Sequence, residues 1–267
     1  MKERIITAIV MLAVFLATFL LPTSAWAVVV CLLAIPMATE WQRISLTSAS
    51  SAGLVLSIWV LTVLGLISIW LFSVLLLAQL AVMVFASTLL IRGQIFGFIR
   101  NGMTVSADIG LVLSAATTLA ALIRMPVDYY VPRFEFVIFA LGIVWLADSG
   151  AYFAGRAFGK HKLAPEVSPK KTWEGMIGGM IAALIWAAFW SPWLYGHGLN
   201  KFSIYVAAIV GSSLSVAGDL AESAFKRVSN QKDSGTLLPG HGGVLDRLDG
   251  VVFGIPAIAT ALYLLNN

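Results

Sequence analysis

The chain has 267 residues, of which 60% are hydrophobic and 11% are charged. Soluble domains carry roughly 25% charged residues, so the composition excludes an ordinary soluble domain and predicts a polytopic membrane protein. The formal net charge of +4 could indicate nucleic-acid binding. The basic residues are instead placed as membrane topology requires, so we expect no nucleic-acid partner. The single cysteine, Cys31, excludes an intramolecular disulfide.

Nine apolar runs predict an all-α fold of about nine transmembrane helices with a cytoplasmic N-terminus. The runs are residues 5–21, 25–39, 52–67, 69–91, 105–123, 134–147, 176–194, 202–220 and 251–265. Ala25-Trp26-Ala27 resembles a signal-peptidase site, but a second apolar run begins at once, so we expect an uncleaved first span. The division at residues 65–68 is the least distinct, and merging the runs there would leave eight helices.

The distribution of basic residues supports nine spans. With a cytoplasmic N-terminus, only Arg124, Arg133 and Lys201 of the 17 Lys and Arg residues fall on the outer side. This excess of inner positive charge follows the positive-inside rule. Eight spans would put the two most basic loops on the side opposite to Lys2 and Arg4, so we prefer nine.

Five acids fall at the inner ends of three predicted helices. Asp148 ends the sixth run, Asp219 and Glu222 end the eighth, and Asp246 and Asp249 precede the ninth. Acids three residues apart share one face of a helix. Carboxylates at a membrane boundary can bind a hard cation through their oxygens, so the five together favour a metal site.

The stretch 223–249 interrupts the apolar sequence with mixed charges. Basic residues interleaved with Asp suit a metal-bound polyphosphate, with cations for phosphate and carboxylates for the metal. Taken singly, Asp246 could form a simple ion pair with Arg247 or Lys226. Glycines around His241 let the backbone turn and bring N–H groups to an anion, although a plain re-entry turn would use the same residues.

A second basic stretch covers residues 155–174. Pro169 suits the first position of a helix capped by Ser168, which predicts that Lys170 and Lys171 lie at a helix N-terminus and bind polyphosphate. The P-loop pattern is absent. Contact with anionic lipid is the alternative for the lysines of this loop.

Two further stretches are predicted to be structural. Gly175 and Gly179, with Gly178 beside them, permit close helix packing at the seventh run. Glu40, Trp41 and Arg43 are typical of an anchor at the membrane interface.

The basic and acidic stretches resemble a known family. Across its 27 residues, the stretch 223–249 matches the signature of phosphatidate cytidylyltransferases, or CDP-diacylglycerol synthases, with no departure. The matching residues are Ser223, Phe225, Lys226-Arg227, Lys232-Asp233, Gly235, Leu238-Pro239, His241-Gly242-Gly243-Val244 and Asp246-Arg247-Leu248-Asp249. Residues 148–152, 155–160 and 168–175 also resemble the family, whereas the first 140 residues resemble it only in hydropathy and in their basic start.

The resemblance implies a membrane enzyme of phospholipid biosynthesis that uses CTP, phosphatidate and Mg²⁺ and releases CDP-diacylglycerol and pyrophosphate. It also implies a homodimer in the bacterial inner membrane with a cytoplasmic active site. We expect residues 1–140 to form a scaffold, and residues 141–267 to form the catalytic region with loops 155–174 and 222–249. A second cation, monovalent or divalent, is compatible with the number of acids.

We assign roles to the charged residues on this basis. The metal ligands are expected to be Asp219, Asp246 and Asp249, with Asp148 and Glu222 as further candidates. The residues expected to hold phosphates are Lys226, Arg227, His241 and Arg247, and those expected to bind CTP are Lys170, Lys171, Ser223, Gly242 and Gly243.

Two other functions stay open. A related CTP-dependent transferase or kinase could act on an isoprenoid lipid. A transporter of an anionic solute is the non-enzyme alternative, but the sequence shows no inverted repeat and no interrupted helix at mid-membrane depth.

Overall fold

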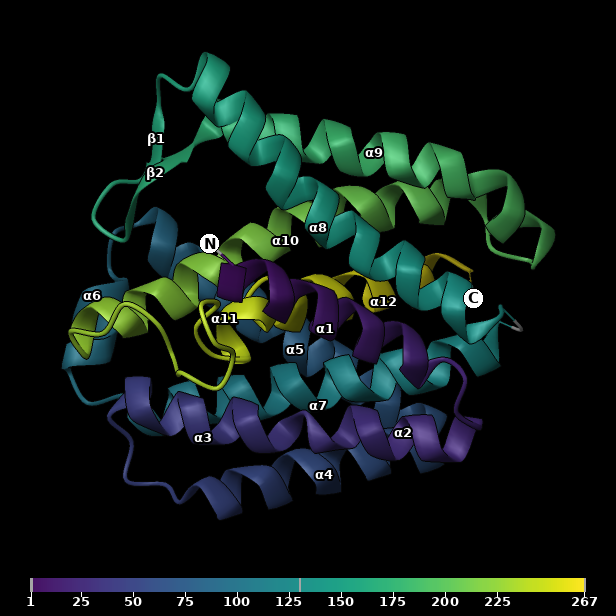
Figure 1. The fold of residues 1–267 in the computed structure, drawn as a ribbon, viewed down its shortest axis with the longest axis horizontal. Coiled ribbons are helices and arrows are strands. Elements are labelled where there is room, and N and C mark those ends of the chain that lie inside the picture. The colour runs from purple at the N-terminus through teal and green to yellow at the C-terminus, as the bar shows by residue number, and fades with distance from the viewer. Residues whose placement is uncertain (1, 130, 267) are drawn as a thin grey trace.

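The computed structural model describes residues 2–129 and 131–266, and Figure 1 shows them as a bundle of helices with one small β hairpin at its edge. The helices are α1 (Lys2–Thr18), α2 (Thr23–Leu32), α3 (Ala34–Ser45), α4 (Ser51–Ile67), α5 (Ile69–Ile91), α6 (Ile95–Arg100), α7 (Thr104–Asp128), α8 (Arg133–Phe158), α9 (Trp173–Gly196), α10 (Lys201–Val228), α11 (Leu245–Leu248) and α12 (Val251–Asn266). The hairpin strands are β1 (Lys162–Ala164) and β2 (Ser168–Thr172).

Helix length and composition confirm the polytopic class. Within the described residues, seven helical segments are long and apolar enough to cross a membrane, and Ile5–Thr18 and Ser51–Ile67 are shorter apolar helices. Seven of the nine predicted runs lie within one helix, whereas residues 5–21 extend past the end of α1 at Thr18 and residues 25–39 are divided between α2 and α3. The division predicted at residues 65–68 is present, so α4 and α5 are separate helices. Ser68 has an extended backbone (φ −138°, ψ 125°), and its hydroxyl accepts a hydrogen bond from the Leu71 N–H at the start of α5.

Two helices that carry predicted site residues run further than expected. The sixth and eighth runs were predicted to end at residues 147 and 220, but α8 continues to Phe158 and α10 to Val228. The polar connections are therefore shorter than the predicted loops 155–174 and 222–249. Hydropathy marks where an apolar environment ends, whereas a helix continues as long as its backbone hydrogen bonds are made.

The predicted helix start at Ser168 and Pro169 is wrong. These residues lie in β2, which pairs antiparallel with β1, with Lys162 opposite Thr172. Helix α9 begins four residues later, where the Thr172 hydroxyl accepts a hydrogen bond from the Gly175 N–H at 3.1 Å. Thr172 is thus the N-cap, and Lys170 and Lys171 reach the site from a strand.

Small residues bring α8 and α9 into close contact, as the Gly175–Gly179 spacing predicts. A Cβ at Gly179 would meet the Ala147 carbonyl oxygen at 2.5 Å, and one at Gly175 would meet the Ala151 carbonyl oxygen at 2.9 Å. Figure 1 shows the two helices as a crossing pair that packs beside α10 and leads into the β hairpin. This packing fixes the hairpin relative to α10.

Arg124 and Arg133, which are predicted to lie on the outer side, bind backbone carbonyl oxygens at the end of the bundle away from the hairpin. Arg124 donates to the Gly65 and Leu66 carbonyl oxygens at the end of α4, at 3.2 and 3.0 Å. Arg133 donates to the carbonyl oxygens that follow α1, those of Phe19 and Leu21. Both residues thus satisfy helix carbonyls that lack a partner within the helix. The side chains of Lys2 and Arg4 are not among those that the structure describes.

The contact between α8 and α9 predicts the effect of a single methyl group. Gly179→Ala forces a Cβ against the Ala147 carbonyl, and such overpacking costs about 1–3 kcal/mol. Gly196→Ala is the matched control in the same helix, because a Cβ there meets nothing within 4 Å. We expect a lower thermal midpoint in detergent for Gly179→Ala alone; equal midpoints for the two variants would contradict the described packing.

Candidate functional site

The five predicted acids gather at the end of the bundle that carries the hairpin. Asp148 lies on α8, Asp219 and Glu222 lie on α10, and Asp246 and Asp249 lie in and directly after α11. They form a row in which neighbouring like charges repel: Asp148 with Asp219, Asp219 with Asp249, Asp249 with Glu222, and Glu222 with Asp246. The structure therefore brings together the acids of three separate helices.

Two lysines neutralise part of this row. Lys226 Nζ lies 3.1 Å from Glu222 Oε1 and 2.8 Å from Asp246 Oδ1, and Lys171 Nζ lies 2.5 Å from Asp219 Oδ2. The simple ion pair between Asp246 and Lys226 is thus present. Over residues 2–129 and 131–266, no group of three His, Cys, Asp or Glu side chains stands ready to hold a metal ion. The metal site stays a prediction.

Asp246 and Asp249 take different partners although they are three residues apart. Asp246 accepts hydrogen bonds from the backbone N–H groups of Ser234 and Gly243, at 2.9 and 2.8 Å, in addition to Lys226. Among the described residues, Asp249 accepts only a local bond, from the Gly250 N–H at 2.7 Å. Asp246 therefore anchors the segment 229–244, whereas Asp249 keeps most of its acceptor capacity free.

The glycines after Pro239 turn the backbone around the Asp246 carboxylate. Gly242 has a φ of +84°, and a Cβ there would meet Asp246 Oδ2 at 2.8 Å. The Gly243 N–H does point at an anion, as the sequence predicts, but this anion is Asp246 of the same chain. The assignment of Gly242 and Gly243 to CTP remains a prediction.

The other predicted residues lie on the same elements as the acids or on the segments next to them. Ser223 donates from its hydroxyl to Asp219 Oδ1 at 3.3 Å, and the Arg247 Nε donates to the His241 carbonyl oxygen at 3.1 Å. Arg227 and Lys170 are exposed. Their positions permit the predicted roles, which stay predictions.

A cavity of about 430 Å³ lies on one side of α10, and we name it the polar cavity after the five charged residues in its otherwise largely apolar lining. Its charged lining comes from Asp148 and Arg156 on α8, Lys170 and Lys171 on β2, and Asp219 on α10. Three cations and two acids therefore face one space between the hairpin and three helices. Such a lining suits an anion with several negative charges.

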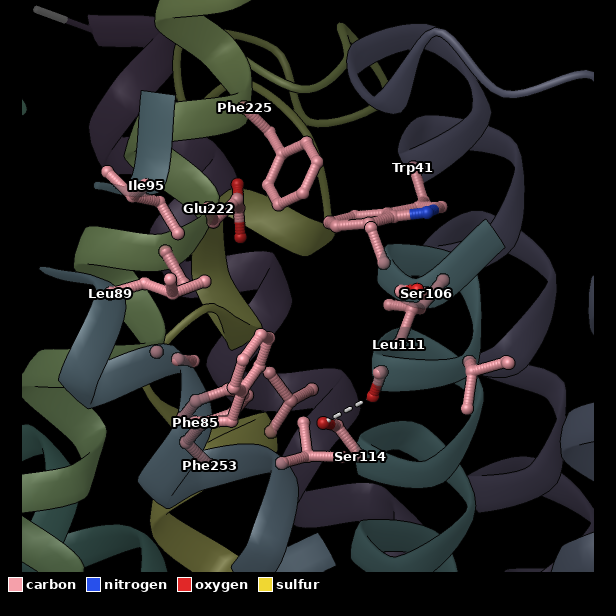
Figure 2. Close-up of a pocket in the computed structure, with 18 of the residues that line it drawn as sticks. Trp41, Phe85, Leu89, Ile95, Ser106, Leu111, Ser114, Glu222, Phe225 and Phe253 are labelled. Atoms are coloured by element: carbon pink, nitrogen blue, oxygen red, sulfur yellow. Dashed lines mark hydrogen bonds between the residues drawn. The ribbon is translucent and has the colours of Figure 1, made fainter. Parts of the chain in front are cut away.

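An apolar cavity of about 400 Å³ lies on the other side of α10 (Figure 2). Its walls come mainly from α5, α6, α7, α10 and α12, and Phe85, Leu89 and Phe253 are among the side chains. Glu222 and Asp249 are the charged residues in its described lining. Figure 2 shows the Glu222 carboxylate beside the Phe225 ring. The cavity thus combines apolar walls with two acids at its edge.

One turn of α10 contributes residues to both cavities. Asp219 lines the polar cavity, while Gly218 and Glu222 line the apolar one. A Cβ at Gly218 would meet the Asp249 carbonyl oxygen at 2.6 Å, so the backbones of α10 and of the segment leading into α12 touch here. The row of acids therefore runs from one cavity to the other.

Sequence reasoning misplaced two residues of the N-terminal half. Glu40 is only 3% exposed and binds the segment 234–245, so its assignment as an interfacial anchor is wrong. Trp41 lines the apolar cavity, donates to Asp108 Oδ1 at 2.9 Å and packs against Phe225 with ring centroids 4.6 Å apart. One signal was available, because Glu40 directly follows an apolar run and an acid is costly to bury without donors.

Fold and site together define a class: a polytopic membrane protein with a row of acids between a cation-lined cavity and an apolar one. The sequence pattern of the Cytidylyltransferase family matches residues 2–265. Because this match covers nearly the whole chain, the chain belongs to the Cytidylyltransferase family.

Curated relatives agree with this membership. A phosphatidate cytidylyltransferase of Haemophilus influenzae is 45% identical over 146 residues, which are 52% of this chain and 50% of that protein. Proteins of the same name from Pseudomonas aeruginosa and Brucella suis are 45% identical over 127 residues and 48% identical over 131 residues, covering 48% and 49% of this chain. The chain spans about half the length of the curated relatives that it matches: 50%, 47% and 46% for these three.

The paired charges around Lys226 predict a large loss of stability when the cation is removed. The side chains of Lys226, Glu222 and Asp246 are 11%, 5% and 6% exposed, so Lys226→Met leaves two buried carboxylates without their cation. Breaking a buried pair in this way costs about 3–5 kcal/mol in the free energy of unfolding. Denaturant titration in detergent measures this cost.

The control is Lys232→Met, which removes an exposed lysine from the same segment. We expect its free energy of unfolding to change by no more than about 0.5 kcal/mol. If Lys226→Met is as stable as this control, the ion pairs of Lys226 do not hold the site together.

Proposed function

We propose that the protein is a phosphatidate cytidylyltransferase, which converts CTP and phosphatidate to CDP-diacylglycerol and pyrophosphate. Family membership, the unbroken signature over 223–249 and the names of the curated relatives support this activity. The single observation that carries the proposal is the row of acids between an apolar and a cation-lined cavity. A reaction between a membrane lipid and a polyphosphate needs both environments at one point.

The substrates are assigned to the cavities by their chemistry. The acyl chains of phosphatidate occupy the apolar cavity between α5, α7 and α12, so that the lipid need not leave the bilayer. Its phosphate then lies near the edge marked by Glu222 and Asp249. The triphosphate of CTP occupies the polar cavity, where Arg156, Lys170 and Lys171 offset its charge.

The reaction is a nucleotidyl transfer. A phosphatidate phosphate oxygen attacks the α-phosphorus of CTP in line, a new P–O bond forms, and the bond to the β-phosphate breaks with release of pyrophosphate. The nucleophile is already ionised, so no strong general base is required. The main barrier is repulsion between two anions, and the fixed charges of Lys171 and the neighbouring cations lower it electrostatically.

The acids offer oxygen ligands of the kind that a magnesium ion takes, although no three of them stand together as a ready metal site among the described residues. Glu222 Oε2 is buried and accepts no hydrogen bond from the described residues, and Asp249 accepts only a local one. Oxygen atoms of this kind are the ligands that Mg²⁺ prefers. Asp219, Asp249 and Glu222 would hold the ion, and Asp148 and Asp246 are the nearest further carboxylates for a second cation. When bound, Mg²⁺ supplies charge neutralisation at the phosphates.

The proposal includes a cellular setting. The relatives are bacterial, and the basic residues other than Arg124, Arg133 and Lys201 fall on one predicted side of the membrane. We therefore place the protein in the bacterial inner membrane, with the acids and the hairpin facing the cytoplasm. A homodimer is part of the same proposal and rests on the family resemblance.

The acids predict a loss of catalysis without a loss of fold. Asp219→Asn and Asp249→Asn each remove one negative oxygen from the row and should lower kcat by about a hundredfold or more. The assay measures pyrophosphate release from labelled CTP by purified protein with Mg²⁺ and phosphatidate.

The matched control is Asp128→Asn, which changes an aspartate paired with Arg124 at the opposite end of the bundle. Near-normal kcat in both site variants would contradict the assigned roles. Activity of the wild-type protein with a polyprenyl phosphate and none with phosphatidate would replace the proposed function by its isoprenoid alternative.

The apolar cavity predicts a dependence on acyl-chain length. Ala221→Trp places a large side chain in this cavity and should raise the KM for long-chain phosphatidate several-fold, while the KM for CTP is unchanged. A short-chain phosphatidate should be affected less. Ala188→Trp, at an exposed position of α9, is the control. An equal effect of both variants on all substrates would show that the cavity does not receive the chains.

A further inference from the structure

Two carboxylates from distant parts of the chain hold the segment 234–245. Asp246 accepts the backbone N–H groups of Ser234 and Gly243. Glu40, on α3, accepts the Ser234 hydroxyl at 3.1 Å, the Val244 N–H at 3.0 Å and the Leu245 N–H at 2.7 Å. Ser234 thus touches both acids. The site segment is therefore held from its own side and from the N-terminal half of the chain.

The bonds from Glu40 fall on the first turn of the helical segment that carries two site acids. The Val244 and Leu245 N–H groups begin α11, where backbone donors have no partner within a helix. A negative charge at this position also interacts favourably with the helix dipole of the span Leu245–Asn266. Glu40 therefore fixes the place at which this span enters the site.

The Glu40 carboxylate packs closely against two glycines of the segment 234–245. A Cβ at Gly235 would meet Glu40 Oε1 at 2.5 Å, and a Cβ at Gly243 would overlap Glu40 Oε2 and the Ser234 hydroxyl. Glu40 is 3% exposed and lies outside the lining of both cavities. It therefore acts on the segment and does not touch the ligands assigned to the cavities.

We propose that Glu40 is a positioning residue: by binding Ser234, Val244 and Leu245 it sets the location of Asp246 and Asp249 in the row of acids. This inference rests on the proposed function for its kinetic consequence. The role requires a carboxylate, because two oxygens that only accept face three donors. A glutamine has only one such oxygen. Its NH2 group is a donor and would face the donors of the segment, with which it cannot form a hydrogen bond.

The test compares Glu40→Gln with Glu135→Gln, a change of the same kind in the first turn of α8, at the end of the bundle away from the site. Two quantities are measured in detergent. The first is the rate of trypsin cleavage at Lys232, which is exposed within the segment 229–244. The second is the kinetics of pyrophosphate release from CTP with phosphatidate and Mg²⁺.

For Glu40→Gln we expect cleavage about tenfold faster, because buried donors lose their acceptor and the segment opens. We expect kcat to fall by about tenfold to a hundredfold, since displaced catalytic groups cost this much. The KM values should stay within about twofold, because the cavity linings are unchanged. A purely structural role would lower the fraction of active enzyme and leave the cleavage rate of the folded fraction unchanged.

Ser234→Ala keeps the test decisive if Glu40→Gln does not fold. It removes one of the three donors and leaves the carboxylate in place, so we expect a smaller fall in kcat, about threefold to tenfold, and a smaller rise in cleavage. Wild-type cleavage and wild-type kcat in a folded variant would overturn the proposal.

Faster cleavage with wild-type kcat would also overturn it, because the segment would then move without displacing the acids. If the wild-type protein itself releases no pyrophosphate, the proposed function fails. The cleavage rates then decide separately whether Glu40 holds the segment.

Discussion

A carboxylate in an apolar bundle must have a cation or several hydrogen-bond donors, and this requirement shapes the end of the molecule that carries the hairpin. Lys226 lies between Glu222 and Asp246, and Lys171 pairs with Asp219. Removing Lys226 leaves two buried carboxylates without a cation, which is strongly destabilising, whereas the partly exposed pair of Lys171 and Asp219 depends less on its partner. The acids and lysines therefore stabilise each other, and the helices that carry them are held at one depth.

The same requirement explains how the N-terminal half takes part. Glu40 has no nearby cation among the described ion pairs, and it is satisfied by three donors of the segment 234–245. Trp41, the next residue, is oriented by Asp108 and forms part of the apolar cavity through its contact with Phe225. One turn of α3 thus supports the charged segment and the apolar wall together. The predicted division at residue 140 separates sequence regions that share a site.

Sequence patterns predicted the helices well and their ends poorly. The nine apolar runs were visible because hydrophobicity directly reflects burial in an apolar environment. The continuation of α8 beyond residue 147 was not, since polar residues form helical hydrogen bonds equally well. Ser168 and Pro169 fit a helix start by type, but Thr172 competes as a cap and the hairpin pairing decides the outcome. Only tertiary contacts distinguish these cases.

The candidate site, too, could be predicted from the sequence only in part. The spacing of the acids and the family signature indicated which residues to examine, and the structure brings them together from three helices. The two cavities, the ion pairs of Lys171 and Lys226, and the contacts of Glu40 with Val244 and Leu245 depend on separations of up to 205 positions in the chain. No local pattern records such contacts.

We propose that a metal ion, a lipid phosphate and a nucleotide meet at the acids where α10 crosses the start of α12. Anomalous X-ray scattering from crystals grown with Mn²⁺ in place of Mg²⁺ and a non-hydrolysable CTP analogue locates the metal directly. The account predicts a peak among Asp219, Glu222 and Asp249, with the triphosphate beside Lys170 and Lys171. A metal and nucleotide bound elsewhere, with this row of acids empty, would contradict it.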